Sequence, residues 1–236
     1  MDLSKYCVII PAYNADHTLP LLLGKLKELY KNIHLYVIDD GSDNNVANYL
    51  VPLPDTEILS HSNNKGKGTA LKTGLKKAQQ ENFDYALCLD ADLQHDPARI
   101  IDFIQKQQES DADIILGRRD FNLRNMPVAR VISNYTTSLI ISARIGRRIY
   151  DSQCGFRLVR LDRIDLDSFI YDGFQFESEF LIRQVDKGLA IEEVKIPTIY
   201  SSEKSSINHA SDTLKFIKLL LHSIFWKKHR RRKCGR

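Results

Sequence analysis

Short apolar runs alternate along the chain with longer segments in which apolar residues recur every three or four positions. The short runs are rich in β-branched residues and lie at 7–10, 35–38, 56–60, 85–89 and 113–116. The longer segments, at 19–30, 69–80 and 98–109, have the spacing of amphipathic helices. This alternation predicts βαβ units over residues 1–120, and therefore an α/β fold whose mostly parallel sheet is flanked by helices.

The pattern changes after residue 124. A long helix is expected at 128–145, then a loop that holds Cys154 and Gly155, and then a strand, a helix and a strand that end near Tyr200. No internal repeat or low-complexity linker interrupts the chain. We therefore expect one domain followed by a C-terminal extension.

The extension contains an amphipathic helix, predicted from Ser211 to Lys227. A narrow polar stripe with Lys215, Lys218 and His222 runs along an otherwise apolar helix, and a basic tail follows it to residue 236. This combination is typical of an interfacial anchor on an anionic membrane surface. The alternative is a helix that packs on the domain and ends in a solvated tail.

Composition agrees with a globular protein, and the charge of the chain is divided. Of 236 residues, 43% are hydrophobic, which is enough to bury one sizeable core. The net charge of +4 averages two parts, because the last ten residues hold seven of the 34 Lys and Arg and no acid. The rest has 27 basic against 30 acidic residues, a net charge of −3. A mildly acidic body argues against nucleic acid as a partner.

Four cysteines without a C-x-x-C pair are typical of a reduced cytoplasmic protein rather than of a disulfide framework or a zinc site. The N-terminal apolar stretch is too short for a signal peptide, and no run approaches eighteen apolar residues. We therefore expect no membrane span and no export.

Polar residues follow the predicted strands where ligands of open α/β sheets bind, outside the carboxyl ends. The four junctions read PAYN at 11–14, DDGS at 39–42, DADLQH at 90–95 and GRR at 117–119. Asp90 and Asp92 share one face if the strand conformation continues, and Gln94 follows the same alternation. Such oxygens suit Mg²⁺ or Mn²⁺ bound to a phosphate. The alternative is that these acids cap the next helix, as Asp96 before Pro97 is expected to do.

Two further stretches suit a nucleotide. Asp39 or Asp40 could accept the ring N–H of uracil or guanine, but taken alone the Asp-Gly-Ser stretch favours an ordinary turn. The loop 63–69 opens a helix, where backbone N–H groups and Lys67 would suit a diphosphate. Its glycine spacing matches neither a Walker A loop nor a dinucleotide-binding fingerprint.

Basic and acidic residues of the second half leave their roles open. Four arginines could bind phosphate, because a forked guanidinium group matches its geometry: Arg118, Arg119, Arg130 and Arg144, with Arg147 and Arg148 beyond them. The alternative is that they form a solvated basic helix face. Glu177 and Glu179 alternate with aromatic residues. They fit either a general base with its partner or the polar face of an amphipathic element, and the second interpretation is favoured.

Taken together and in order, these stretches resemble the family 2 glycosyltransferases with a GT-A fold. The matching words are VIIPAYN, VIDDGSD, NKGKGTALKTG, CLDADLQHDP, GRRD, DSQCGFRLVR and FQFESEFLI followed by EEVKIPTIY. Within that family the chain is similar to dolichyl-phosphate mannose synthases and related polyprenyl-phosphate glycosyltransferases over about residues 6–200. The resemblance implies a catalytic domain over 1–205, with a nucleotide-binding half at 1–120 and an acceptor half at 121–205, followed by the helix and basic tail of 206–236.

The resemblance implies roles on the donor side. The nucleotide diphospho-sugar would be held by Pro11, Tyr13, Asn14 and Asp40, with Asp40 on the base, and Lys67 would lie near the nucleotide. The metal, Mg²⁺ or Mn²⁺, would be bound by Asp90, Asp92 and Gln94, with Asp92 catalytic.

On the acceptor side, the resemblance implies that Arg119 and Arg130 are catalytic and grip an acceptor phosphate, with Asn134 nearby. Because the family usually reads Gly-Ser-Arg where this chain has GRR, Arg118 is a second candidate. Gln153, together with Asp151 and 155–157, would shape this side of the pocket. Glu177 and Glu179 are kept as substrate-binding residues, and as bases if the acceptor is a hydroxyl.

The implied activity is inverting transfer of a sugar from a UDP- or GDP-sugar to a polyprenyl phosphate at the cytoplasmic face of a membrane. The protein would be peripheral there and reach the membrane through 211–236, a membrane-protein partner or a homo-oligomer. A saccharide or protein hydroxyl as acceptor, a non-catalytic nucleotide-sugar-binding module and a nucleotidyltransferase are the alternatives. The Asp90 and Asp92 pair argues against a non-catalytic module.

Overall fold

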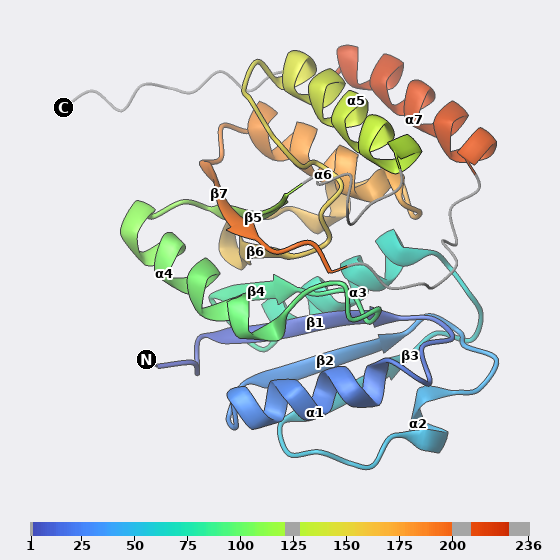
Figure 1. Ribbon diagram of the computed structural model, residues 1–236, viewed down its shortest axis with the longest axis vertical. Coiled ribbons are helices and arrows are strands. Elements are labelled where there is room, and N and C mark those ends of the chain that lie inside the picture. The colour runs from blue at the N-terminus through green and yellow to red at the C-terminus, as the bar shows by residue number, and fades with distance from the viewer. Residues whose placement is uncertain (1, 121–127, 200–208, 227–236) are drawn as a thin grey trace.

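A computed structural model describes residues 2–120, 128–199 and 209–226, and in it seven strands form one mixed sheet (Figure 1). The spatial order is β3-β2-β1-β4-β6-β5-β7. The strands are β1 (Tyr6–Ala12), β2 (His34–Asp39), β3 (Thr56–Ser60), β4 (Tyr85–Cys88), β5 (Ile114–Arg119), β6 (Arg157–Arg160) and β7 (Ile191–Ile196). Only β6 runs antiparallel to its neighbours, β4 and β5, so the expected mostly parallel sheet is confirmed.

Helices cover both faces of this sheet (Figure 1). They are α1 (Leu19–Leu29), α2 (Val46–Tyr49), α3 (Lys67–Gln80), α4 (Ile100–Ser110), α5 (Val128–Ile145), α6 (Gln175–Asp186) and α7 (His209–Ile224). Short 3-10 turns occur at Pro97–Arg99, Leu161–Arg163 and Leu166–Ser168. The predicted helices are all present, and β6, α6 and β7 form the expected strand, helix and strand of the second half.

The core consists of two apolar layers, one on each face of the sheet. Alternation along β1 supplies both, since Cys7 and Ile9 face the layer under α3 and α6, and Val8 and Ile10 face the layer under α1 and α4. A strand that is buried on both faces has a continuous apolar sequence, and residues 8–10 of β1, Val-Ile-Ile, follow this rule. Among the described residues, Cys7, Cys88 and Cys154 are buried free thiols; Cys234 lies outside them.

The chain leaves β1 for β2 on one side of it, and β4 lies on the other side. At such a switch point the loops after neighbouring strands diverge and leave a crevice at the carboxyl ends. The crevice brings together the ends of β1, β2 and β4, which the sequence separates by about half of the domain. Within the described part of the chain, no helix has both the length and the apolar content that a membrane span requires.

Candidate active site

The crevice holds a pocket of about 780 Å³ at the carboxyl ends of β1, β2, β4 and β5. Helices α3, α5 and α6 contribute the rest of its wall. The structure brings together thirteen of the residues that the sequence points to: Pro11, Tyr13, Asn14, Asp40, Lys67, Asp90, Asp92, Gln94, Arg119, Arg130, Asn134, Gln153 and Glu177. Two predicted substrate-binding residues, Arg118 and Glu179, do not line this pocket.

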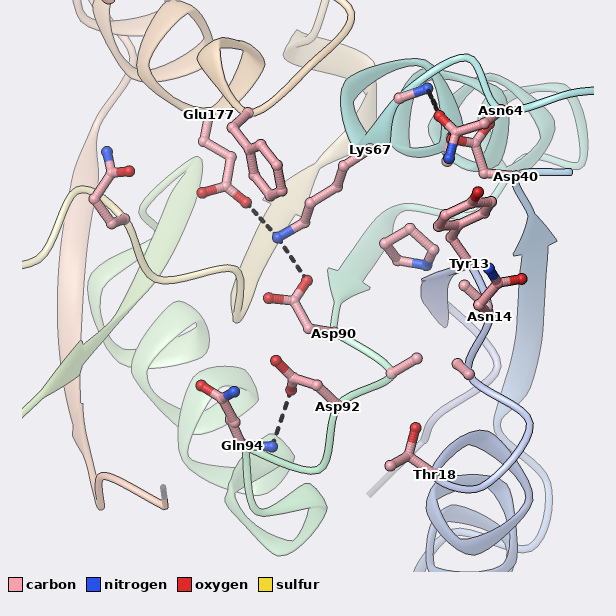
Figure 2. A pocket seen from close by; sticks show the side chains of 18 of the residues that line it. Tyr13, Asn14, Thr18, Asp40, Asn64, Lys67, Asp90, Asp92, Gln94 and Glu177 are labelled. Atoms are coloured by element: carbon pink, nitrogen blue, oxygen red, sulfur yellow. Dashed lines mark hydrogen bonds and ion pairs between the residues drawn. The ribbon is translucent and has the colours of Figure 1, made fainter. Parts of the chain in front are cut away.

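The three expected metal ligands lie along one turn that follows β4 (Figure 2). The strand ends at Cys88, and Leu93 has a φ of 60°, so the strand alternation that we assumed for Asp90, Asp92 and Gln94 is wrong. The turn nevertheless aims all three at the pocket, and the Gln94 N–H donates to Asp92 Oδ1 at 3.0 Å. Asp96 is the residue that caps the following turn, through Ala98 N at 3.0 Å. Asp90 and Asp92 are therefore not needed as caps.

The two aspartates differ in their tendency to ionise. Burial by itself raises the pKa of Asp90, but the charge of Lys67 and the neighbouring His95 outweigh it and hold that pKa well below the usual carboxyl value. Burial and the negative charge of Asp90 both raise the pKa of Asp92. Asp90, next to Lys67, is thus ionised. An added cation would favour ionisation of Asp92 most, as expected for paired oxygen ligands of a divalent metal.

Lys67 lies between two carboxylates, with Nζ 2.7 Å from Asp90 Oδ1 and 2.7 Å from Glu177 Oε1 (Figure 2). Burial lowers the pKa of Lys67, but these two charges more than compensate and raise it above its usual value. Glu177 in turn lies 3.5 Å from Nη2 of the buried Arg157. Glu177 thereby lies between two cationic side chains, those of Lys67 and Arg157.

The close approach of residue 155 to Asp90 explains why the DSQCGFR stretch has a glycine there. A Cβ at this position would lie 2.2 Å from Asp90 Oδ2, a separation that no side chain tolerates. Residues 155–157 were expected to shape the acceptor side. Instead Gly155 makes room for Asp90, and Arg157 lies beneath the pocket next to Glu177.

The two aspartates after β2 have different tasks. Asp39 accepts the N–H groups of Ser42 and Val46, both at 3.0 Å, and so builds the turn. Asp40 lines the pocket, and its carboxylate accepts the N–H groups of Lys65 at 3.0 Å and Gly66 at 2.8 Å. The turn interpretation therefore holds for Asp39, and Asp40 is the one placed to meet a ligand.

Some of the N–H groups that we expected to bind a diphosphate, in the loop before α3, already have partners within the protein. The N–H of Gly66 is bonded to Asp40, and the N–H of Thr69 donates to the Asp172 carbonyl at 3.1 Å. A Cβ on Gly68 would lie 2.6 Å from that of Phe176, so the segment before α6 packs tightly on this helix end. The loop contributes the Lys67 side chain to the pocket instead.

Cationic groups from β5 and α5 line the opposite wall. Arg119 is fixed by a two-pronged ion pair with the buried Asp151, with Nε 2.6 Å from Oδ2 and Nη2 3.0 Å from Oδ1. Arg130 and Asn134 lie one turn apart on α5 and both line the pocket. Arg119 is thus the arginine of the GRR stretch that reaches the site.

Three sequence expectations need correction. Arg118 belongs to the end of β5, not to a loop, and its guanidinium lies 3.6 Å from the centre of the Tyr150 ring. Arg144 is no phosphate ligand, since it pairs with Asp186 at 2.8 Å. Glu179 is fully buried and accepts the N–H groups of Ile170 and Tyr171 while pairing with Arg183, so its role is to hold the loop before α6.

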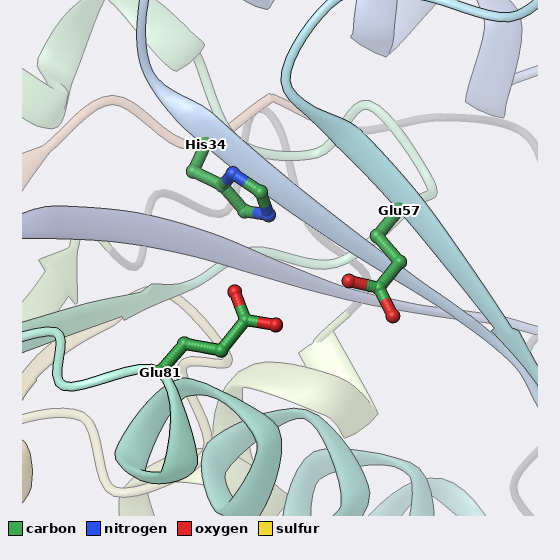
Figure 3. Close-up of side chains that lie close together, drawn as sticks. All are labelled: His34, Glu57 and Glu81. Atoms are coloured by element: carbon green, nitrogen blue, oxygen red, sulfur yellow. The ribbon is translucent and has the colours of Figure 1, made fainter.

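Two lining residues and one side-chain cluster were not singled out from the sequence. Thr18 and Asn64 line the pocket from the loops that follow β1 and β3 (Figure 2). A separate cluster of His34, Glu57 and Glu81 has ligand atoms within 4.8 Å of one another (Figure 3). It lies at the amino ends of β2 and β3, on the edge opposite the pocket, and Lys77 Nζ pairs with both glutamates at 2.9 and 2.7 Å.

Comparison with known proteins identifies the family of the chain. The model of glycosyl transferase family 2 matches residues 7–162. The UDP-N-acetylglucosamine-dolichyl-phosphate N-acetylglucosaminyltransferase of Methanococcus voltae is 32% identical, over 82% of this chain and 85% of its own. The polyprenol monophosphomannose synthase of Mycolicibacterium smegmatis is 29% identical, over 80% of this chain and 75% of its own.

Among solved structures, glucosyl-3-phosphoglycerate synthase from Mycobacterium tuberculosis in complex with Mn²⁺ and UDP-glucose superposes with a TM-score of 0.73. The match covers 92% of this chain and 78% of that one at 18% identity. At this identity the likeness concerns the fold, and it is the fold that the ordered motifs led us to expect.

Proposed function

The chain belongs to glycosyl transferase family 2 and has a GT-A-like fold, and we propose that it transfers a sugar from a UDP- or GDP-sugar to a polyprenyl phosphate. The observation that carries this proposal is the division of one pocket into two walls. Carboxylates from the ends of β2 and β4 form one wall, and Arg119 with Arg130 forms the other. A donor with a metal-bound diphosphate suits the first wall, and an anionic acceptor suits the second.

The donor wall supports a nucleotide diphospho-sugar with Mg²⁺ or Mn²⁺. Asp90, Asp92 and Gln94 supply the oxygen ligands that these cations prefer, and Gly155 leaves the space that Asp90 needs in order to face them. Asp40, held by the loop before α3, is placed to receive the base, whose ring N–H both uracil and guanine present. Pro11, Tyr13 and Asn14 would pack around the nucleoside.

The acceptor wall supports a phosphate rather than a hydroxyl. A hydroxyl acceptor needs a general base, and Glu177 and Glu179 are the candidates. Glu177 is held between Lys67 and Arg157, and Glu179 is enclosed by the loop before α6. A phosphate is already ionised and needs no base, and two curated relatives are named for lipid-phosphate acceptors.

In the proposed reaction an oxygen of the acceptor phosphate bonds to the anomeric carbon of the sugar, with inversion. The bond from that carbon to the donor diphosphate breaks, and the nucleoside diphosphate leaves with the electron pair. A bound divalent metal would offset the charge that develops on the leaving group. Lys67 would add a second positive charge there, and Arg119, Arg130 and Asn134 would orient the attacking phosphate.

The acceptor also bears on where the enzyme works. We infer a peripheral position at the cytoplasmic face of a membrane, reached through 211–236, with a membrane-protein partner or a homo-oligomer as other routes. Residues 227–236 lie outside the described residues. We further propose 1–205 as the catalytic domain, with its donor half ending near residue 120 and its acceptor half near residue 205.

The test combines purified protein, UDP- or GDP-sugars, Mg²⁺ or Mn²⁺, and either a short-chain polyprenyl phosphate or sugar acceptors. Nucleoside diphosphate and glycosylated product are measured by mass spectrometry. We expect product with the lipid phosphate, and a loss of at least about a hundredfold in Asp92→Ala. Asp96→Asn is the matched control, because an asparagine also caps the following turn and position 96 lies outside the pocket wall.

Full activity in Asp92→Ala would contradict the metal assignment. Transfer to a sugar hydroxyl that is abolished in Glu177→Gln would favour the alternative acceptor class. Binding of a nucleotide sugar without product from any acceptor would favour a non-catalytic module.

A further inference from the structure

Helix α5 carries a stripe of apolar residues on the side that faces away from the protein. Val128, Ile132, Tyr135 and Leu139 follow one another at helical spacing and are 57%, 59%, 51% and 46% exposed. Its inner side packs Ile141 and Ile145 into the core, and Ser142 Oγ there lies within hydrogen-bond distance of the carbonyls of Ser138 and Ile149. The four outer residues therefore form a second apolar stripe of this helix, and that stripe is exposed in the structure.

Helix α7 has two apolar sides. Leu219 is fully buried, and Phe216, Leu220 and Trp226 pack beside it against the domain. On the other side Leu214, Ile217, Leu221 and Ile224 are 47–69% exposed, and Phe225 beyond them is 83% exposed. Packing on the domain therefore accounts for only half of the apolar surface of this helix.

The two helices lie next to each other on the outer side of α6 (Figure 1). Arg144, near the end of α5, donates to the Ser223 hydroxyl of α7 at 2.9 Å and to its carbonyl at 2.5 Å. The same guanidinium pairs with Asp186 at the end of α6. Arg144 thereby ties α5, α6 and α7 into one unit, and the exposed apolar residues of α5 and α7 form one surface, which we call the outer apolar face.

Basic residues dominate the charges near this face, although Asp212 belongs to α7 and Arg147 pairs with Glu192. The stretches 121–150 and 213–236 hold 14 of the 34 Lys and Arg and none of the 30 acidic residues. At its border Lys215 and Lys218 of α7 are exposed, as are Arg147 and Arg148 after α5. Arg148 lies 5.1 Å from the ring centre of Tyr150, itself 41% exposed. Apolar residues bordered by cations and tyrosines are complementary to an anionic lipid surface. The apolar residues would contact the acyl chains, and the cations would contact the negative headgroups above them.

We propose that the outer apolar face docks on an anionic lipid bilayer, with α5 as well as α7 inserted at the level of the headgroups. This extends the membrane contact beyond residues 211–236 and assigns half of it to α5. The inference rests on the proposed function in one respect, since a lipid acceptor gives the docking its purpose.

Docking through α5 would also set the direction of the pocket. The helix presents Arg130 and Asn134 to the acceptor wall, while Ile132 and Tyr135 at the same level are exposed. A helix with its side chains is about 10 Å across. The phosphate of a lipid in the bilayer would therefore need to travel only about that distance to meet the arginines, without its chain leaving the membrane.

The test compares binding of the full chain to vesicles of phosphatidylcholine with and without phosphatidylglycerol, by flotation. Leu139→Glu on α5 and Leu221→Glu on α7 each place a charge in the face. We expect each to weaken binding to the anionic vesicles roughly tenfold or more. Leu21→Glu is the matched control, because Leu21 is 60% exposed on α1, away from this face, and should bind like the unaltered protein. Thermal unfolding checks that all three variants fold.

A second measurement needs no substitution. Trp226, two residues beyond the end of α7, is the single tryptophan of the chain, and it packs against the domain beside the exposed Phe225, so its fluorescence reports on this end of the face. We expect lipids brominated on their acyl chains to quench it in anionic vesicles.

Unchanged vesicle binding in Leu139→Glu would overturn the role of α5. A dimer that Leu139→Glu dissociates, without vesicle binding by the unaltered protein, would assign the face to a second copy and overturn the proposal. Transfer to a short-chain acceptor without vesicle binding would refute docking and leave the proposed function intact. Vesicle binding that depends on the face would support docking even if no sugar transfer is found.

Discussion

On the donor side of the pocket, Lys67 lies between two carboxylates. The region of α5 and α7 differs, because the chain has no acidic residue between residues 121 and 150 and none after Asp212. On the donor side charges are buried and paired, and their positions depend on close backbone contacts such as that of Gly155 with Asp90. In the α5–α7 unit most cations remain at the surface and apolar side chains face outward. In the two proposals, one domain holds charge for two purposes: local precision at a reaction centre, and adhesion to an extended anionic surface.

The largest effect on stability is expected from Asp151→Ala, which tests whether the pocket depends on buried pairing. It leaves the Arg119 guanidinium without its two-pronged partner in a buried position, which costs about 3–5 kcal/mol. Urea unfolding measures the loss, and Asp162→Ala at an exposed site is the control, within about 0.5 kcal/mol of the unaltered protein. Equal stability of the two variants would contradict the importance of the pair.

Arg144→Met tests whether the α5–α7 unit is joined by charge as well as by apolar packing. The substitution removes hydrogen bonds to Asp186 and Ser223 and should destabilise the protein by about 2–3 kcal/mol. Limited proteolysis should then cut in or near α7 sooner, while Mn²⁺ binding by the pocket is unchanged. A loss of Mn²⁺ binding that parallels the proteolysis would show that the two regions are not separable.

Gly155→Ala tests the close contact beneath the proposed metal site. The added methyl group overlaps Asp90 Oδ2, so we expect a cost of about 1–3 kcal/mol and a displaced carboxylate. Calorimetric titration should show weaker Mn²⁺ binding. Unaltered Mn²⁺ affinity in a folded Gly155→Ala protein would mean that Asp90 is no ligand.

The smallest effect, and one of opposite sign, is expected from Gly24→Ala in α1. No atom lies within 4 Å of the position that its Cβ would take, so the helix preference of alanine should dominate. We expect a gain of about 0.5–1 kcal/mol in urea unfolding, with Mn²⁺ binding unchanged. This variant separates the general effect of replacing glycine from the specific contact at Gly155.

Most of the site could be predicted because its residues stand directly after strands. In a parallel sheet the carboxyl ends of the strands meet at one edge, so Asp40, Asp90 and Asp92 are brought together by any fold that pairs these strands. The same argument does not reach Thr18 and Asn64, because they lie several residues beyond the ends of β1 and β3, where strand order alone does not place a side chain.

Residue type and spacing by themselves determined the α/β class, the order of the elements, the acidic turn after β4 and the basic C-terminus. Those properties are local or periodic, and periodicity needs no knowledge of distant contacts. The tertiary structure alone decided which groups act together: that Arg119 pairs with Asp151, that Arg144 binds Asp186, and that Glu179 holds a loop while Glu177 faces the pocket. It also decided that one apolar stripe of α5 stays exposed while another packs into the core. Each depends on which partner arrives from a remote part of the chain, and side-chain type does not specify that partner.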